Sequence, residues 1–435
     1  MPAVKKHPKP DERVKQSGAA ERRPLTVLFF SHSSGLTGSE QGVLELVAEL
    51  IADHGTACTV VCPGDGPLVG KLQAVGAVTL VEPKLGWWAG QSSNAIEKTI
   101  ADGACALLKL IPALQQIDPA VVYTQSITIP WGASAASLLE KPHLWSICEF
   151  GELDHGLKFL DEFADVLEQV KSGASFIRTS SEAVRLTLFP ELPPDRVRTV
   201  YRHSPTLSAP IEPAADAFQR ASATRLAVFG TLHEGKGQLE AVEAVAQLLA
   251  RGRDVELLLA GHADPQYRAR IEALIERLGM QNRVRISDFL PEPFPTMLAA
   301  DILLVCSRNE AFGRVVVEGM KLGRPVVYSK SGGIPEYMKD GVTGLSYQPG
   351  DVSELAERIE ELIANPERAK QMGTEAKRYA CAKFSRNGGE ILEILRDLQT
   401  VHDGAGSRVA MPKRVVASLA SVAIQEENGI TIWPN

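Results

Sequence analysis

Short runs of apolar, β-prone residues alternate with helical segments along most of the chain. In the first half these runs are Thr26–Phe30, Ala57–Cys62, Val78–Val81, Ala120–Thr124, His143–Ile147 and Phe176–Thr179. In the second half they are Arg225–Phe229, Val255–Ala260, Val284–Ile286, Ile302–Cys306 and Pro325–Tyr328. Near-continuous apolar strands that alternate with helices are typical of parallel sheets covered on both faces. The pattern therefore predicts an α/β protein with two doubly wound domains.

Each predicted domain opens with the same local unit. Thr26–Phe30 leads into a glycine-bearing loop, Ser31–Glu40, and then into a helical pattern. Arg225–Phe229 leads in the same way into Gly230–Gly237 and a second helical pattern. Strand, glycine loop and helix together open a βαβ unit, and ligands of such sheets bind at the carboxyl ends of the strands. We therefore expect one site, in a cleft where the two domains face each other.

Segments outside these units indicate the domain boundaries. We expect a first domain over 25–205, a Pro/Ala-rich linker over 206–222 and a second domain over 223–385. Residues 1–24 form a basic head, for which two interpretations stay open: a disordered solubilising tail, or an electrostatic contact with anionic lipid headgroups. The tail over 402–435 has no role that its sequence indicates.

The segment Ser307–Glu318 (SRNEAFGRVVVE) carries the densest polar signal. Glu310 precedes a predicted helix, and Glu318 lies inside it. The start of this helix would offer the free backbone N–H groups of Phe312, Gly313, Arg314 and Val315. A helix N-terminus binds anions, and carboxylates beside it can accept hydrogen bonds from sugar hydroxyls, which together fit a nucleotide diphosphate-sugar. A purely structural interpretation, with Glu310 as an N-cap and Glu318 solvated, stays open.

The loop Gly230–Gly237 nearly matches the P-loop pattern G-x-x-x-x-G-K-[ST]. Gly237 stands where the Mg²⁺-binding Ser or Thr belongs, so nucleoside triphosphate hydrolysis is disfavoured. What remains is Lys236, with Gly230 and Thr231 before it, placed to neutralise a diphosphate. The alternative is an ordinary lysine on a surface turn.

Two further glycine loops follow predicted strands. Gly332 and Gly333 come after Pro325–Tyr328 and suggest a backbone that approaches a ligand, although a tight turn explains them nearly as well. The segment Gly35–Gly38 lies between the first strand and its helix and could close over a phosphate, although it lacks the third glycine of the dinucleotide-binding fingerprint. We predict Gly38, Ser39, Gly332 and Gly333 as substrate-binding residues.

Composition restricts the class of protein. The chain has 435 residues, 46 Lys and Arg against 53 Asp and Glu, a net charge of −7 and 44% hydrophobic residues. This balance fits a soluble globular protein and argues against a dedicated nucleic-acid binder. The six cysteines form no C-x-x-C pair, there is no apolar signal region, and Lys109 and Pro112 interrupt the apolar stretch Ala104–Leu114. We therefore expect a cytoplasmic protein without a transmembrane segment. The sequence has no D-x-D and no Cys/His cluster, so we expect catalysis without a metal or other cofactor.

At this point the motifs resemble a known family. EAFGRVVVE over Glu310–Glu318, the following GMKLGRPVV and GGIPE, and the loop that ends in Lys236 are similar to the E-x7-E region and phosphate loop of family-4 retaining glycosyltransferases. Gly38-Ser39-Glu40 resembles the N-terminal loop of that family. The resemblance covers about residues 25–400 and is strongest over 225–385.

This resemblance implies the GT-B fold, with two Rossmann-like domains, and transfer of a sugar from a UDP- or GDP-linked donor with retention. By resemblance, Glu318 would bind the ribose, Glu310 and the amides of Phe312 and Gly313 the sugar, and Lys236 with amides near Arg314 and Val315 the diphosphate. A helix over 386–401 would cross back to the first domain. Many relatives build cell-surface polysaccharides or glycolipids, which implies a glycan or lipid-linked acceptor and peripheral contact with the cytoplasmic face of the membrane.

Two positions depart from the family pattern. Thr231 stands where an arginine is usual, so Arg202 or Arg314 would have to supply that charge. Glu149 follows the strand His143–Ile147 where a histidine is frequent, and we predict it as a third catalytic group beside Glu310 and Lys236. These departures also support an alternative, a catalytically inactive nucleotide-sugar-binding protein with the same fold.

Overall fold

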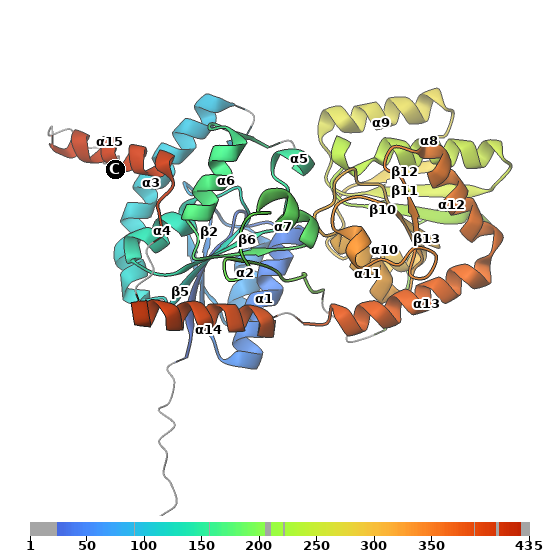
Figure 1. The fold of residues 1–435 in the computed structure, drawn as a ribbon. Helices are drawn as coiled ribbons and strands as arrows, with labels where there is room; N and C mark the ends of the chain where they lie inside the picture. The colour runs from blue at the N-terminus through green and yellow to red at the C-terminus, as the bar shows by residue number, and fades with distance from the viewer. Residues whose placement is uncertain are drawn as a thin grey trace, which may run out of the picture.

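The computed structural model describes residues 24–90, 92–155, 157–204, 210–220, 222–386, 388–405 and 409–427. The predicted basic head, apart from residue 24, lies outside the described residues. So do the last eight residues of the tail. The described chain forms two α/β domains that lie side by side (Figure 1).

Within the described residues, seven parallel strands form the sheet of the first domain in the order β3-β2-β1-β5-β6-β8-β9. The strands are β1 (Thr26–Phe30), β2 (Ala57–Cys62), β3 (Val78–Val81), β5 (Val121–Gln125), β6 (His143–Ile147), β8 (Phe176–Thr179) and β9 (Val197–Thr199). The helices are α1 (Gly38–His54), α2 (Pro67–Ala74), α3 (Ser93–Ile117), α4 (Trp131–Leu139), α5 (Glu152–His155), α6 (Phe163–Ser172) and α7 (Glu182–Leu188). A short antiparallel pair, β4 (Ala89–Gly90) and β7 (Lys158–Phe159), lies outside this sheet.

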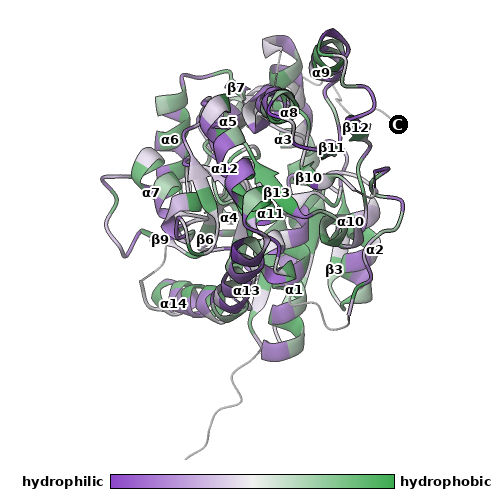
Figure 2. Ribbon diagram, turned by 90° about the vertical axis from the view of Figure 1, so that its right-hand side faces the viewer, coloured by the Kyte–Doolittle hydropathy of each residue, from purple (hydrophilic) through white to green (hydrophobic). Residues whose placement is uncertain are grey.

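In the described part of the second domain, six parallel strands run in the order β12-β11-β10-β13-β14-β15. They are β10 (Thr224–Phe229), β11 (Val255–Ala260), β12 (Val284–Ser287), β13 (Ile302–Val305), β14 (Val326–Ser329) and β15 (Leu345–Tyr347). The α-helices are α8 (Gln238–Ala250), α9 (Pro265–Arg277), α10 (Phe294–Ala299), α11 (Arg314–Leu322), α12 (Val352–Ala364) and α13 (Pro366–Lys383). In Figure 2, β13 is green at the centre of this domain, while α13 on its surface carries many purple residues.

The predicted fold class, two doubly wound parallel-sheet domains, is confirmed. Every strand predicted from an apolar run exists, most with the predicted bounds, because such runs are buried on both faces. Sequence reasoning missed β9 and β15, which have only three residues each. A run of three residues is too short to separate a strand from a loop by its pattern.

Two helices follow the second domain. α14 (Gly388–Ala405) places Ile391, Ile394 and Leu395 in the core below β1 of the first domain. α15 (Lys413–Glu427) packs beside α3, and Val415 is fully buried there (Figure 1). The tail, for which the sequence indicated no role, therefore completes the first domain's surface over its described part.

The helix α3 runs without interruption through Pro112, which the sequence analysis expected to divide its apolar stretch. By length and composition alone it could cross a membrane. That is weak evidence, because core helices of soluble domains pass the same test, and Ala104, Leu107 and Leu114 are fully buried against the first domain.

Polar contacts connect the two domains near the start of α7. The Glu336 carboxylate accepts the backbone N–H groups of Glu182 (2.9 Å) and Ala183 (2.6 Å) at the start of α7, and the Tyr201 hydroxyl (2.9 Å). The described part of the predicted linker, 210–220, lies against the second domain, where Gln219 N–H donates to Glu256. The described linker is thus a packed segment, and the two domains hold a defined arrangement.

Candidate active site

A cavity of about 520 Å³ lies between the two domains, at the carboxyl ends of their strands. Of the predicted site residues, the first domain contributes Gly38, Ser39 and Glu149. The second contributes Gly230, Thr231, Lys236, Glu310, Phe312, Gly313, Arg314 and Val315. The site thus forms where the doubly wound topology predicts, and it needs both domains.

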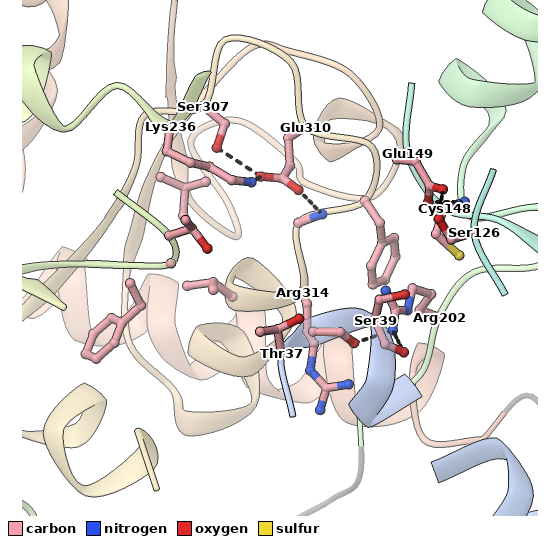
Figure 3. Close-up of a pocket in the computed structure, with 18 of the residues that line it drawn as sticks. Thr37, Ser39, Ser126, Cys148, Glu149, Arg202, Lys236, Ser307, Glu310 and Arg314 are labelled. Atoms are coloured by element: carbon pink, nitrogen blue, oxygen red, sulfur yellow. Dashed lines mark hydrogen bonds and ion pairs between the residues drawn. The ribbon is translucent and has the colours of Figure 1, made fainter. Parts of the chain in front are cut away.

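Lys236 and Glu310 form the charged centre of the cavity (Figure 3). Glu310 Oε2 accepts hydrogen bonds from Lys236 Nζ (2.6 Å) and from the Ser307 hydroxyl (2.9 Å), and Oε1 accepts the Gly313 N–H (3.2 Å). Gly237, with a φ of 66°, follows Lys236, and a Cβ there would come within 2.2 Å of the Cys306 carbonyl oxygen. A glycine is therefore needed for this loop to lie against the end of β13.

Helix α11 begins at the cavity. Gly313 precedes it with a φ of 82°, and a Cβ at Gly313 would lie 3.0 Å from both Ile334 Cγ1 and the Tyr337 hydroxyl. Burial raises the pKa of Tyr337 well above its usual value, so its hydroxyl stays protonated and donates to the Phe312 carbonyl (2.5 Å). The loop is thereby fixed with the helix N-terminus toward the cavity, an arrangement that stabilises a bound anion.

A smaller cavity of about 170 Å³ adjoins the first and shares Thr231, Arg314 and Val315 with it. Glu318 lines this smaller cavity rather than the larger one. So do His262 and Phe289, whose rings stack with centroids 4.6 Å apart and planes 6° from parallel. Neither ring is among the predicted site residues; the position of His262, two residues after the end of β11, was the available signal.

Glu318 is deeply buried and paired with Arg314, whose Nε donates to Glu318 Oε1 at 2.6 Å. Burial is the main reason that the pKa of Glu318 is raised, and Arg314 opposes that rise only in part. Burial by itself would lower the pKa of Arg314, but Glu45 and Glu318 outweigh it and the pKa is raised. Both cations named for the missing family arginine are engaged elsewhere: Arg202 donates to the carbonyls of Gly38 and Ser39.

Glu149 lies on the first-domain side of the cavity, separate from Lys236 and Glu310 (Figure 3). Its carboxylate accepts the Ser126 hydroxyl (2.5 Å), the Ile127 N–H (2.5 Å) and the Cys148 N–H (3.0 Å). Ser126 has a φ of 85°, which is strained for a residue other than glycine. These bonds hold the loop after β5, and a catalytic role for Glu149 stays a prediction.

The glycines of the third predicted loop lie behind the site. A Cβ at Gly332 would come within 2.0 Å of the Glu310 carbonyl oxygen, and the Gly333 N–H donates to that oxygen at 2.8 Å. Neither glycine is among the residues that line the two cavities. Both support the loop that carries Glu310, and direct contact with substrate stays a prediction.

The first domain's glycine loop contains a contact between His32 and Glu40 that sequence reasoning did not identify. His32 Nε2 lies 3.3 Å from Glu40 Oε1, and Trp87 Nε1 donates to the His32 carbonyl (2.6 Å). Burial tends to raise the pKa of Glu40, but His32 and the Thr37 hydroxyl hold it below its usual value. Among the described residues, no group of three or more His, Cys, Asp or Glu side chains could hold a metal ion.

Comparison with known proteins gives the class to which this fold belongs. Residues 219–379 match the family model described as glycosyl transferases group 1. The HepE protein of Anabaena, solved in complex with UDP and glucose, aligns with a TM-score of 0.69 and 21% identity over 86% of this chain and all of that one. Sucrose-phosphate synthase of Thermosynechococcus elongatus aligns with a TM-score of 0.68 and 18% identity over 87% of this chain and all of that one. The two-domain arrangement is the GT-B fold.

Two curated relatives with similar sequences align with less than half of this chain. Alpha-D-kanosaminyltransferase of Streptomyces kanamyceticus is 32% identical over 173 residues, 39% of this chain and 44% of that protein. A D-inositol 3-phosphate glycosyltransferase of Corynebacterium diphtheriae is 35% identical over 197 residues, 42% of this chain and 46% of that protein. The aligned part thus spans less than half the length of each of these curated relatives.

Proposed function

We propose that the protein is a glycosyltransferase that moves a sugar from a UDP- or GDP-linked donor to a hydroxyl group, with retention at the anomeric carbon. The observation that carries the proposal is the arrangement of Lys236, Glu310 and the α11 N-terminus in a cavity between two GT-B domains. These groups lie within the segment that matches the group 1 family model.

In this proposal the donor binds mainly to the second domain. The diphosphate lies between Lys236 and the amides at the start of α11, where the cation and the helix dipole both favour negative charge. Glu310 accepts hydrogen bonds from the sugar hydroxyls. The nucleoside extends into the smaller cavity, where the stacked rings of His262 and Phe289 offer a flat surface and Glu318 a carboxylate for the ribose.

The reaction then exchanges one bond at the anomeric carbon for another. The bond to the diphosphate oxygen breaks, the acceptor oxygen bonds to the same face, and the acceptor proton moves to the departing phosphate. Lys236 and the helix amides stabilise the negative charge that develops on the diphosphate, which lowers the barrier for its departure. The chain's own contribution is positioning and electrostatics, and we propose that no metal is required.

The acceptor would enter from the first domain. There the cavity is lined by hydroxyl groups of Ser39, Ser126 and Thr128, and by Trp87, which is 39% exposed. An exposed indole face beside hydroxyl groups suits a sugar ring. We therefore propose a glycan or lipid-linked acceptor, with the protein in the cytoplasm and in peripheral contact with the membrane.

A donor panel tests the proposal. The protein is incubated with UDP- and GDP-linked sugars, UDP-glucose first because HepE is solved with UDP-glucose, and release of nucleoside diphosphate is followed with simple glycosides as acceptors. Lys236→Ala should lower kcat by at least about 100-fold, because it removes the cation at the leaving group. Lys330→Ala, at an exposed lysine near the same sheet edge, is the matched control and should leave the rate unchanged.

Two results would contradict the proposed glycosyltransferase activity. If no donor binds, or if Lys236→Ala equals Lys330→Ala, the proposed site is wrong. If a donor binds but neither transfer nor hydrolysis occurs with any acceptor, the catalytically inactive nucleotide-sugar-binding protein is the better description.

A further inference from the structure

An arginine of the second domain reaches across the cleft to a glutamate of the first. Arg314 Nη1 donates to Glu45 Oε2 at 2.9 Å, and Nη2 donates to Oε1 at 2.5 Å. The same guanidinium donates through Nε to Glu318. The three side chains are only 11%, 14% and 8% exposed in the order Arg314, Glu45, Glu318. One buried cation thus joins a carboxylate of each domain.

This contact lies in the wall of the candidate nucleotide pocket. Arg314 lines both cavities, and Glu318 lines the smaller one. Glu45 lies on α1, two turns after Gly38, which also lines both cavities. The Arg314–Glu45 pair therefore holds the first turns of α1 against the nucleotide pocket, where the first domain covers that pocket.

The geometry divides the guanidinium between its two partners. Glu45 accepts two parallel bonds, from Nη1 and Nη2, in a bidentate arrangement that is stronger than a single hydrogen bond, and Glu318 receives one bond, to Oε1. Without the Glu45 charge, the guanidinium fork would have Glu318 as its remaining carboxylate partner. Paired with both Glu318 oxygens, it would remove the hydrogen-bond acceptors that a ribose needs.

We propose that Glu45 is a positioning residue for the donor. By binding the Arg314 fork it keeps Glu318 available to the nucleotide's hydroxyl groups, and it holds the first domain on the nucleotide pocket. This inference rests on the proposed function, and it assigns a donor-binding task to a residue of the opposite domain. Neither the family resemblance nor the sequence pattern points to Glu45, which reads as one of several polar residues on a surface helix.

Other interdomain contacts let this role be tested without separating the domains. Glu336 binds the start of α7 independently of Glu45. Glu49, one turn further along α1, offers a matched control: it is also a buried carboxylate, it lies 3.8 Å from His203, and it does not line either cavity.

The experiment measures binding of UDP, GDP and ADP by calorimetry, and donor KM and kcat where transfer occurs. Glu45→Gln, which keeps the shape and removes the charge, should weaken nucleotide binding and raise donor KM about tenfold. Glu45→Asp keeps a carboxylate for the Arg314 fork and should bind nucleotide within about threefold of wild type. Glu49→Gln should bind as wild type does.

The conservative variant distinguishes positioning from structural support, because Glu45→Gln keeps the side-chain length and loses the charge, whereas Glu45→Asp shortens the side chain and keeps the charge. Binding by Glu45→Gln within about twofold of wild type, or binding by Glu45→Asp as weak as that by Glu45→Gln, would overturn the inference and leave the proposed function intact. If wild type binds none of the nucleotides, the proposed function fails and the inference fails with it.

Discussion

The two domains open with the same strand, glycine loop and helix, but the charged groups of the two loops face different partners. In the second domain, the Lys236 side chain extends from its loop into the cavity and donates a hydrogen bond to Glu310. In the first domain, the titratable side chains of the loop contact each other, as His32 and Glu40 do. The same local fold therefore presents a cation in one domain and hydroxyl and backbone groups in the other.

Under the proposed function, this difference assigns the two substrates to the two halves of the cleft. A nucleoside diphosphate-sugar carries negative charge and needs the cation and helix N-terminus of the second domain. The first-domain carboxylate in the cavity, Glu149, is already bonded to the Ser126 hydroxyl and two backbone amides. A neutral, hydroxyl-rich acceptor suits that side better than a charged one. The chain's overall charge of −7 is consistent with this, since donor binding then depends on a few local groups.

The largest effect should come from the second-domain carboxylate. Glu310→Gln keeps the shape of the side chain but removes the charge that pairs with Lys236 and that, in the proposed function, orients the sugar. We expect kcat/KM to fall by about 100- to 1000-fold while nucleoside diphosphate binding changes little. Steady-state kinetics with the best donor from the panel, beside calorimetry with the free diphosphate, separates the two. A variant with unchanged kcat/KM would remove Glu310 from the site.

Acid should weaken the first domain through a buried histidine. His143 bonds to the Thr124 hydroxyl (2.7 Å) and the Gly173 carbonyl (2.6 Å), and burial lowers its pKa to about 4. Between pH 6.5 and about 4 the unfolded chain binds a proton that the folded protein does not. The free energy of unfolding should therefore fall by about 3 kcal/mol as the pH drops through this window.

Tryptophan fluorescence during urea unfolding measures this loss of unfolding free energy for the first domain alone. The tryptophans among the described residues, Trp87, Trp88, Trp131 and Trp145, all belong to the first domain. His143→Gln should flatten the dependence on pH between 6.5 and 4. An equally steep dependence in this variant would place the acid sensitivity elsewhere.

Sequence reasoning could predict the elements that a long pattern specifies. Runs such as Ala57–Cys62 and Val255–Ala260 are mostly apolar because both faces of each sheet are covered, and both form strands with the predicted bounds. Lys236 and Glu310, 74 positions apart in the chain, could be assigned to one site because both follow strands of one parallel sheet.

The remainder depends on packing that a linear pattern does not contain. The glycines Gly332 and Gly333 suggested a backbone near a ligand, but the space they leave is filled by the backbone of the Glu310 loop. Glu45 has no distinguishing neighbours in the sequence, and its partner lies 269 positions away in the other domain. Such contacts follow from how the two domains dock, which single-sequence reasoning does not reach.

Helix α15 packs on the first domain, and two neighbouring valines of this helix differ in burial. Val415 is fully buried between this helix and the first-domain core, whereas its neighbour Val416 is 47% exposed. Val415→Ala should lower the free energy of unfolding of the first domain by about 2 kcal/mol, because it removes two buried methyl groups and leaves a cavity. Val416→Ala should change it by less than about 0.5 kcal/mol. Equal effects at the two positions, measured by tryptophan fluorescence in urea, would show that α15 does not pack on the core.

The smallest effect should come from Glu149, and it tests the assignment of the two halves most directly. Because three hydrogen bonds direct its carboxylate to the loop after β5, Glu149→Gln should act through acceptor positioning rather than through the departing diphosphate. We expect a rise in acceptor KM of about tenfold or less, with donor KM and nucleoside diphosphate affinity unchanged. The control is Glu310→Gln, the same chemical change on the opposite wall. A loss of kcat as large as that of Glu310→Gln would instead make Glu149 a catalytic residue, and the catalytic charges would then no longer be confined to the donor wall.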